Sequence, residues 1–520
     1  MATRLRRFLA LLCAVALAAP LPAHAAASDG DAQIIHVLNR LAFGPTAADV
    51  AHVRAIGIDR YIDEQLHPQT LAEPAELSQR LAGLDTLKLN PVELFKEYGP
   101  ILPIMNGGVK LTPEEQKARR QRARIIVQQA QDARIWRALY SPRQLQEVMV
   151  DFWFNHFNVS ADKGLDHLWV GRYEADAIRP YALGHFRDLL RATAHSPAML
   201  FYLDNQLNTE PGIPGGVRGN ETGINENYAR EIMELHTLGV DGGYTQDDVI
   251  ALAHVLTGWG LARPGLGRGD GSAQAFDPSR HDFAAKTLLG RTIAPGGEPQ
   301  VEQAIDLLAA QPATARHIAF QLAQYFVSDK PPQGLVDRLA QRFSATDGDI
   351  AAVLKTLFAS GEFRDSAGQK YKTPYQYVIS AARAAGVEVN NPRPLLGTMA
   401  RLGQPLYRCQ TPDGYKNTED AWLSPDATTL RIGFATGLGR GVLPLKNPPP
   451  EQQAAAGMTP TTQLVADQRG DPPKPQPLDA APLAALLAPV LSDNTRSTVA
   501  EAPDGLKAAL ILGGPDFMRR

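Results

Sequence analysis

Apolar residues recur at the three- and four-residue spacing of amphipathic helices along most of the chain, and strand-like alternation is scarce. The best strand candidate is a short hairpin edge from Lys286 to Arg291. We therefore expect an all-α fold, or an α fold with minor β hairpins. The predicted helices lie near residues 31–43, 47–66, 114–139, 142–158, 176–195, 225–238, 246–259, 299–310, 313–327, 333–344, 347–360, 374–387, 427–438 and 480–491.

Several predicted helices open with a capping box. In this motif a Ser or Thr side chain and a carboxylate or amide three residues later satisfy each other's backbone N–H groups. Versions with Pro at the first helical position begin at Thr112, Ser141 and Thr373, and looser versions begin at Thr46 and Thr245. These signals fix where the helices should start.

Loop-forming residues divide the chain. Residues 204–224 are rich in Asn, Gly and Pro, and residues 261–280 are rich in Gly. Residues 444–478 hold two proline runs and a Gln/Ala stretch, which is typical of a linker. We expect a helical body over 26–443, open to division into two subdomains near residue 295, and a C-terminal helical segment over 479–520 that packs back on it.

Residues 1–25 have the three regions of a cleavable signal peptide in order. Arginines come first, an apolar run extends from Phe8 to about Ala19, and Ala23-His24-Ala25 fits a signal peptidase. The run is too short to span a bilayer, and no later stretch approaches about 18 uncharged apolar residues. The expected mature protein begins near Ala26 and is periplasmic or secreted, with no transmembrane segment.

Two details of the leader qualify this expectation. Cys13 follows Leu12, where a lipid-attachment site needs a small residue, so a lipoprotein is disfavoured. The Arg6-Arg7 pair leaves the choice between general secretory and twin-arginine export open. After cleavage Cys409 is the only cysteine, which excludes an intramolecular disulfide and predicts a buried, unreactive thiol.

The charge of the chain excludes one class of partner. The formal net charge is −3, and loss of the three leader arginines makes it −6. Nucleic-acid binding needs concentrated basic charge, so we expect no nucleic-acid partner. Standard catalytic and phosphate-binding motifs such as Gly-x-Ser-x-Gly, His-Glu-x-x-His and Cys-x-x-Cys are absent from the sequence. Candidate chemistry must therefore come from polar residues in apolar surroundings.

The helix predicted over 142–158 carries three such residues, Asp151, Asn155 and His156. Because it is apolar on almost every side, it should be buried, and an unpaired buried polar group costs roughly 1–3 kcal/mol. Asp151 and Asn155 are spaced to touch each other, whereas His156 needs a partner from another segment. His156 is either a hydrogen-bonded core histidine or a site histidine. The apolar residues around the helix are Val148, Phe152, Trp153, Phe154 and Phe157.

The helix predicted over 225–238 places Glu231 inside its apolar stripe, with Asn227 and Glu234 beside it. A buried carboxylate pairs with a base, binds a metal or takes up a proton. Glu231 is thus either a structural partner of a distant arginine or a general acid/base or metal ligand. The i,i+4 spacing predicts a rim contact between Arg230 and Glu234.

A third polar cluster, His281-Asp282, follows the glycine-rich loop. A histidine beside a carboxylate on a loop is common at functional sites and also common by chance. Asp204-Asn205 forms a weaker cluster at a helix end. His254 and His317 fall at helix edges and receive no role.

Several blocks occur in one order along nearly all of the mature chain. With this combination the chain resembles the bacterial family called "domain of unknown function 1800". The resemblance implies export and a helical fold, and the family has no established activity or cofactor. The chain departs from the family pattern in an Asn/Gly/Pro insert after Asn205, which puts a role for Asp204 and Asn205 in doubt. The blocks are 38–46, 152–157, 225–239, 243–249, 256–259, 281–283, 326–329, 372–374 and 403–405.

These residues favour a periplasmic or secreted enzyme of hydrolytic type. Its site would lie between the helices at 142–158 and 225–238, below the loops 204–224 and 261–283. The catalytic candidates are Glu231, His156, His281 and Asp282. The substrate-orienting candidates are Asn155, Asn227, Arg230, Glu234 and Trp153.

A divalent metal ion is compatible with this site, and His156, Glu231 and His281 are the candidate ligands. The spacing selects no metal, so the cofactor stays open. The rival hypothesis is a secreted binding or assembly protein, acting with a protein partner outside the cytoplasm, in which the same residues form a buried structural network. Convergence on an open cleft would favour the enzyme, and separate partners in a closed core would favour the rival. The sequence does not indicate a substrate.

Overall fold

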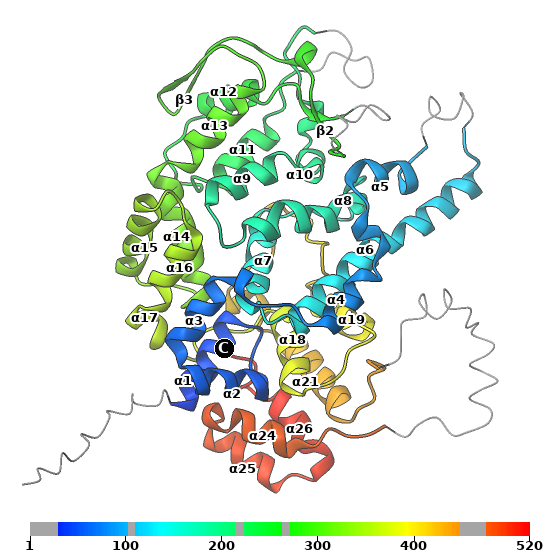
Figure 1. Cartoon of the computed structure of the whole chain (residues 1–520), viewed down its shortest axis with the longest axis vertical. Helices are drawn as coiled ribbons and strands as arrows, with labels where there is room; N and C mark the ends of the chain where they lie inside the picture. Colours follow the sequence, from blue (N-terminus) through cyan, green and yellow to red (C-terminus); the bar gives the residue numbers. More distant parts are fainter. Residues whose placement is uncertain (1–29, 102–109, 214–222, 263–270, 447–474) are drawn as a thin grey trace, which may run out of the picture.

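Helices build most of the chain that the computed structural model describes, residues 30–101, 110–213, 223–262, 271–446 and 475–520 (Figure 1). The β structure in these ranges is two antiparallel hairpins. In the first, β1 (Trp259–Leu261) pairs with β2 (Gln274–Phe276), and in the second, β3 (Lys286–Leu288) pairs with β4 (Arg291–Ile293). The expected all-α fold with minor β hairpins is confirmed, including the hairpin edge at Lys286.

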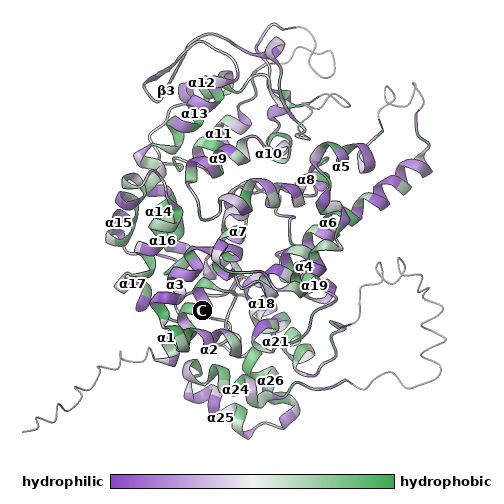
Figure 2. Ribbon diagram, viewed as in Figure 1, coloured by the Kyte–Doolittle hydropathy of each residue, from purple (hydrophilic) through white to green (hydrophobic). Residues whose placement is uncertain are grey.

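Helix α7 lies near the middle of the molecule in Figure 1 and packs against α1, α3 and α6 of the first half of the chain. The long helix α6 packs against α8, and α11 packs against α12. The outer, N-terminal end of α6 is largely hydrophilic (Figure 2). The helices are α1 (Asp31–Leu41), α2 (Ala47–Ile56), α3 (Ile58–Leu66), α4 (Ala75–Ala82), α5 (Pro91–Tyr98), α6 (Pro113–Tyr140), α7 (Gln144–His156), α8 (Asp166–Arg172), α9 (Phe186–Ala194), α10 (Pro197–Tyr202), α11 (Glu226–Glu234) and α12 (Gln246–Val255).

The second half adds two groups of helices. In Figure 1, α14 to α17 line one side of the molecule, and α24 to α26 lie beside α21 near the N-terminal helices. The helices are α13 (Pro299–Ala309), α14 (Pro312–Phe326), α15 (Gln333–Ala345), α16 (Ile350–Phe358), α17 (Gly361–Arg364), α18 (Pro374–Ala384), α19 (Arg393–Arg401), α20 (Glu419–Trp422), α21 (Pro425–Gly439), α24 (Ala480–Leu487), α25 (Asp493–Glu501) and α26 (Asp504–Gly513).

Short turns of other helix types connect these elements. The 3-10 turns are η1 (Pro68–Thr70), η2 (Asp85–Lys88), η5 (Arg179–Tyr181), η6 (Asn205–Leu207), η7 (Pro278–Arg280) and η8 (Ala488–Val490), and η4 (Tyr173–Ile178) is a π-helical turn. One hydrophobic core runs from α1 to the end of the described chain, and a small satellite core lies under α4. None of the described helices is long and apolar enough to cross a bilayer.

Four of the five capping signals predicted a helix start correctly. Thr46, Thr112, Thr245 and Thr373 each form a complete capping box. The box expected at Ser141 is wrong, because the Ser141 hydroxyl accepts from the Arg143 N–H and α7 starts later, at Gln144.

Several predicted helices are too long. The range 47–66 is interrupted at Gly57, where φ is +87°, and forms α2 and α3. The range 176–195 is broken into η4, η5 and α9, because Pro180 lacks the N–H that a continuous helix needs. The range 225–238 ends as α11 at Glu234, so Leu235 and Leu238 lie beyond the helix.

The C-terminal segment packs on the body. Helix α26 lies along α21, and Tyr371 pairs with Arg519 in an antiparallel bridge. Cys409 is a free, buried cysteine, as predicted. The predicted signal peptide, residues 1–25, and most of the predicted linker, residues 447–474, lie outside the described residues.

Candidate functional site

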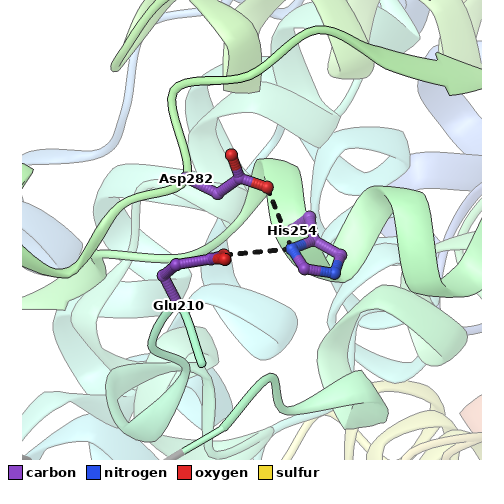
Figure 3. A group of neighbouring side chains, drawn as sticks. All are labelled: Glu210, His254 and Asp282. Carbon is purple, nitrogen blue, oxygen red and sulfur yellow. Dashed lines mark hydrogen bonds and ion pairs between the residues drawn. The ribbon is translucent and has the colours of Figure 1, made fainter. Parts of the chain in front are cut away.

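Three segments that are distant in sequence bring Glu210, His254 and Asp282 together (Figure 3). His254 lies in the last turn of α12. Glu210 follows the turn η6, and Asp282 follows the turn η7. All three side chains are partly buried, so solvent can reach the group.

The two carboxylates face the same atom of the histidine. Glu210 Oε2 lies 3.1 Å from His254 Nδ1, and Asp282 Oδ2 lies 3.0 Å from it. The three atoms all lie within 4.8 Å of one another. An imidazole nitrogen carries at most one proton, so it cannot donate a full hydrogen bond to each of two carboxylates. A shared cation would satisfy all three groups.

Backbone hydrogen bonds hold the three segments in this arrangement. The Glu210 N–H donates to the Arg280 carbonyl (3.0 Å), and the Asp282 N–H donates to Thr257 Oγ1 (2.9 Å). The Gly258 N–H donates to the Asn208 carbonyl (3.2 Å). Gly258 has φ +72°, and a Cβ there would lie 2.4 Å from the Asp277 carbonyl oxygen, so the crossing requires glycine.

Buried amides and one arginine fix the Glu210 segment further. Asn205 donates to the Trp259 carbonyl (2.6 Å), and Asn208 donates to the Ala253 carbonyl (2.8 Å). Arg280 donates to the Asn208 carbonyl (3.0 Å) and to Thr209 Oγ1 (2.9 Å). These hydrogen bonds connect the turns of the site to one another and limit the movement of the Glu210, His254 and Asp282 side chains.

Lys286 holds Asp282 from behind. Its ammonium lies 3.3 Å from Asp282 Oδ1 and donates to the Asp282 carbonyl oxygen. Partial burial raises the pKa of Asp282, but the Ala284 N–H and the Lys286 charge lower it more, so the net shift is downward. The two carboxylates of Glu210 and Asp282 outnumber the single ammonium of Lys286 beside them, which suits a cation.

The donor set fits a divalent metal ion. Ligands at right angles on metal bonds of about 2.1 Å lie about 3 Å apart, and the two oxygens lie 3.0 and 3.1 Å from Nδ1. Imidazole with carboxylates suits zinc, iron or manganese. Three protein ligands leave coordination positions open, which is typical of catalytic rather than structural sites.

Residues 36–519 match the model of a family described as "Protein of unknown function (DUF1800)". The chain belongs to this family. No curated protein matches the chain, and no solved structure does either. The resemblance drawn from the sequence blocks is thus confirmed over nearly the whole chain.

His156, a candidate for catalysis, lies in a closed part of the core of this DUF1800 protein. Its Nδ1 lies 2.7 Å from Gln321 Oε1, and its Nε2 lies 3.1 Å from the His236 carbonyl oxygen. Burial, and then His317, lower the pKa of His156 to about 3. As predicted, its partners come from other segments, and the neutral ring joins α7 to the end of α11 and to α14.

Asn155 and Trp153, two of the orienting candidates, also bind backbone. Asn155 donates to the Tyr415 carbonyl (2.8 Å) and accepts from the Tyr415 N–H (2.7 Å). Trp153 donates to the Ala182 carbonyl (2.9 Å). Asp151 pairs with Arg134 rather than with Asn155, because that guanidinium is buried beside it. The cavity beside Asp151 and Asn155 has a volume of about 30 Å³, room for a water molecule or two.

His281 points away from its neighbour Asp282, into the core. Its Nδ1 lies 2.7 Å from the Thr257 carbonyl, and its Nε2 lies 3.1 Å from Gln300 Oε1 and from the Gly296 carbonyl. His281 and His156 share no hydrogen-bond partner within the described residues. The structure therefore separates the two histidines. Of His156, His281 and Asp282, only Asp282 belongs to the group with Glu210 and His254.

The candidates on α11 form a polar strip with mixed roles. Glu231 is half-buried, and burial, followed by Glu234, raises its pKa. Asn227 donates to the Leu203 carbonyl (3.1 Å). The predicted pair of Arg230 with Glu234 is wrong. Arg230 reaches back one turn to Glu226 (3.0 Å), and Glu234 accepts from the Tyr244 hydroxyl (3.1 Å) instead.

Sequence reasoning missed two of the three residues in the group. His254 was assigned no role because it follows an ordinary helix pattern, and Glu210 lies in a loop with no motif around it. One signal was available. The glycine-rich stretch before Asp282 and the Asn-rich stretch before Glu210 both mark loops, and sites often lie where loops meet a helix end.

Proposed function

We propose that this protein is exported and acts as a divalent-metal-dependent hydrolase, with Glu210, His254 and Asp282 as the metal ligands. The observation that carries the proposal is the convergence of two carboxylate oxygens on one imidazole nitrogen, at 3.0 and 3.1 Å. Export is supported by the signal-peptide pattern of residues 1–25. Asp282 is kept from the sequence candidates, whereas Glu210 and His254 take the place of His156, Glu231 and His281 as metal ligands.

A bound divalent cation would supply Lewis acidity and lower the pKa of a water molecule. The chain's own residues supply the geometry. Lys286 holds the carboxylate of Asp282, and the Thr257 hydroxyl accepts from the Asp282 N–H. His281 anchors the same segment to the core through the Thr257 carbonyl. Such support keeps ligands in place and raises metal affinity.

Metal content tests the ligand set. Elemental analysis of the purified protein should give one divalent metal ion per chain, and His254→Ala and Asp282→Asn should lose it. His52→Ala is the matched control, because His52 also faces a carboxylate, Glu64 at 2.8 Å, but only one. Wild-type protein that binds no divalent metal, or His254→Ala protein that keeps it, would exclude this site.

Activity is tested separately. The metal-loaded protein is assayed on chromogenic carboxylic esters, phosphoesters and anilides, and hydrolysis of one class should require both the metal and His254. N-terminal sequencing of the protein from the cell envelope tests export, and the expected first residue is near Ala26. A chain beginning at Met1 would contradict export.

A buried ionic network favours the non-enzymatic alternative, a secreted binding or assembly protein. Arg134 pairs with Asp151 and Glu174, and Arg179 pairs with Glu147 and Glu174. These groups are satisfied by one another in the core, as expected of a network that fixes a fold. Full stability without metal, together with no hydrolysis of any substrate class, would support this alternative.

A further inference from the structure

A cluster of buried basic side chains lies where α1 meets the pairing of residues 370–372 with 518–520. Lys370 and Arg520 exchange backbone hydrogen bonds across this pairing (2.8 and 3.3 Å). Helix α1 reaches the cluster through Arg40, which donates to the Ser366 carbonyl (2.6 Å). The exposed fractions are 0% for Arg40, Lys370 and Arg431, 3% for Lys372 and 4% for Arg520.

Aromatic faces compensate three of these cations. A guanidinium or ammonium over a ring gains from the negative face of the π system. Arg431 lies between two tyrosines, and Arg520 and Lys372 each cover one ring. The distances to the ring centroids are 4.6 Å for Arg431 to Tyr371, 4.7 Å for Arg431 to Tyr377, 4.6 Å for Arg520 to Tyr325 and 3.9 Å for Lys372 to Phe517.

One carboxylate faces the remaining cations, and it is already engaged. Asp329 accepts from the Lys370 ammonium through one oxygen and from the Glu419 N–H through the other (2.8 Å). Within the described residues, Arg40 pairs with no carboxylate and no aromatic face, and its Nε and Nη1 have no hydrogen-bond partner. Arg520 Nε also has none. Burial, and then Arg520, hold the pKa of Arg40 below its usual value.

Buried N–H groups without acceptors are costly, and uncompensated buried charges are more so. Two carboxylates act on these cations, and both are already paired, Asp329 with Lys370 and Asp151 with Arg134. We propose that Arg40, Lys370 and Arg520 bind a small inorganic anion with the size and charge of chloride. The anion would accept from the unpaired guanidinium N–H groups and join α1 to the C-terminal pairing. This site is separate from the metal ligands.

The test compares anions at constant ionic strength. The melting temperature of the full chain is measured while sodium chloride replaces sodium methanesulfonate, whose anion is bulkier. Specific binding to the folded state should raise the melting temperature by about 1–2 °C for each tenfold rise in chloride above the dissociation constant. Arg40→Met should lose this dependence. Arg364→Met, in an exposed arginine that donates to the Ala359 carbonyl, should keep it.

Bromide gives a second measurement that needs no variant. Crystals grown with bromide should show an anomalous peak within hydrogen-bond distance of the Arg40 guanidinium. Equal melting temperatures in chloride and methanesulfonate, or bromide crystals without that peak, would overturn the proposal even if Arg40→Met does not fold.

Discussion

Helices α7 and α12 each carry a histidine in the last turn, and the two histidines differ in burial and in their partners. His156, at the end of α7, is enclosed and bonded to a glutamine side chain and a backbone carbonyl. His254, near the end of α12, is partly open to solvent and faces two carboxylates. The difference shows that aromatic neighbours in sequence mark a histidine as buried, whereas acidic partners from distant loops mark it as a ligand candidate.

The largest expected effect comes from pH and concerns the buried histidines around the end of α7. Burial lowers the pKa values of His156, His236 and His317 below 6.5 in the folded state. Unfolded chains therefore take up these protons first as the pH falls below 6.5. For each of these histidines that stays neutral in the folded state, the free energy of unfolding should fall by up to about 1.4 kcal/mol for each unit that the pH falls below 6.5.

Urea unfolding between pH 7 and pH 5 measures this slope. His236→Gln should reduce it by about 1.4 kcal/mol per pH unit, because one proton is removed from the balance. His67→Gln, at an exposed histidine outside this cluster, is the matched control for the substitution itself. A His236→Gln slope equal to that of the wild type would mean that His236 stays accessible to protons in the folded state.

The ionic network beside α7 gives the next largest effect. Glu174 accepts from Arg134 (3.0 Å), Arg179 (2.8 Å) and the Tyr407 hydroxyl (2.7 Å). Glu174→Gln leaves two buried guanidinium groups short of a partner, so the free energy of unfolding should fall by about 3–5 kcal/mol. Metal content should not change. Glu226→Gln, in the partly exposed pair with Arg230, should cost less than about 1 kcal/mol.

Metal removal addresses the α12 side of the comparison. At a free metal concentration of 100 times the dissociation constant, binding adds about 2.7 kcal/mol to stability. Chelation should remove that increment from the wild type and leave Asp282→Asn unaffected. Calorimetry with and without chelator measures it. If chelator lowers the stability of both proteins equally, the metal binds elsewhere.

Glu231→Gln should have the smallest effect. The carboxylate is half-buried, its pKa is raised by burial and then by Glu234, and the neighbouring Arg230 is bonded to Glu226. Removing one of two like charges three residues apart should stabilise the protein by about 0.2–0.5 kcal/mol at neutral pH. Chemical denaturation would detect this gain. A loss of several kcal/mol would instead reveal a buried ionic partner of Glu231.

Much of the fold was readable from local patterns. A capping box is formed by residues only three positions apart. Thr112 and Thr373 therefore predicted the starts of their helices from the local sequence alone. The aromatic helix around Trp153 was correctly predicted to be buried. Helix ends were harder. Pro180 broke a predicted helix, and α11 stopped before Leu235 because tertiary contacts, not periodicity, decide where a helix ends.

The candidate site was much less readable. Asp282 was identified from its place beside a loop, but its partners lie 28 and 72 positions earlier, at His254 and Glu210, and no motif connects them. Asn155 and Asn227 were predicted to orient a substrate, because each is a polar residue beside an apolar helix face. In the structure they bind main-chain groups of distant segments. A single sequence cannot distinguish a side chain that holds the backbone from one that holds a substrate.

Helix α1 has a consequence for the timing of folding. His36 bonds to the Phe363 carbonyl and Arg40 to the Ser366 carbonyl, contacts that span 327 and 326 positions. During synthesis α1 must wait until those residues have emerged, and such long-range closure slows folding. Because the core closes late, the chain stays unfolded for longer. This would suit passage through a translocation channel, as the proposed export requires.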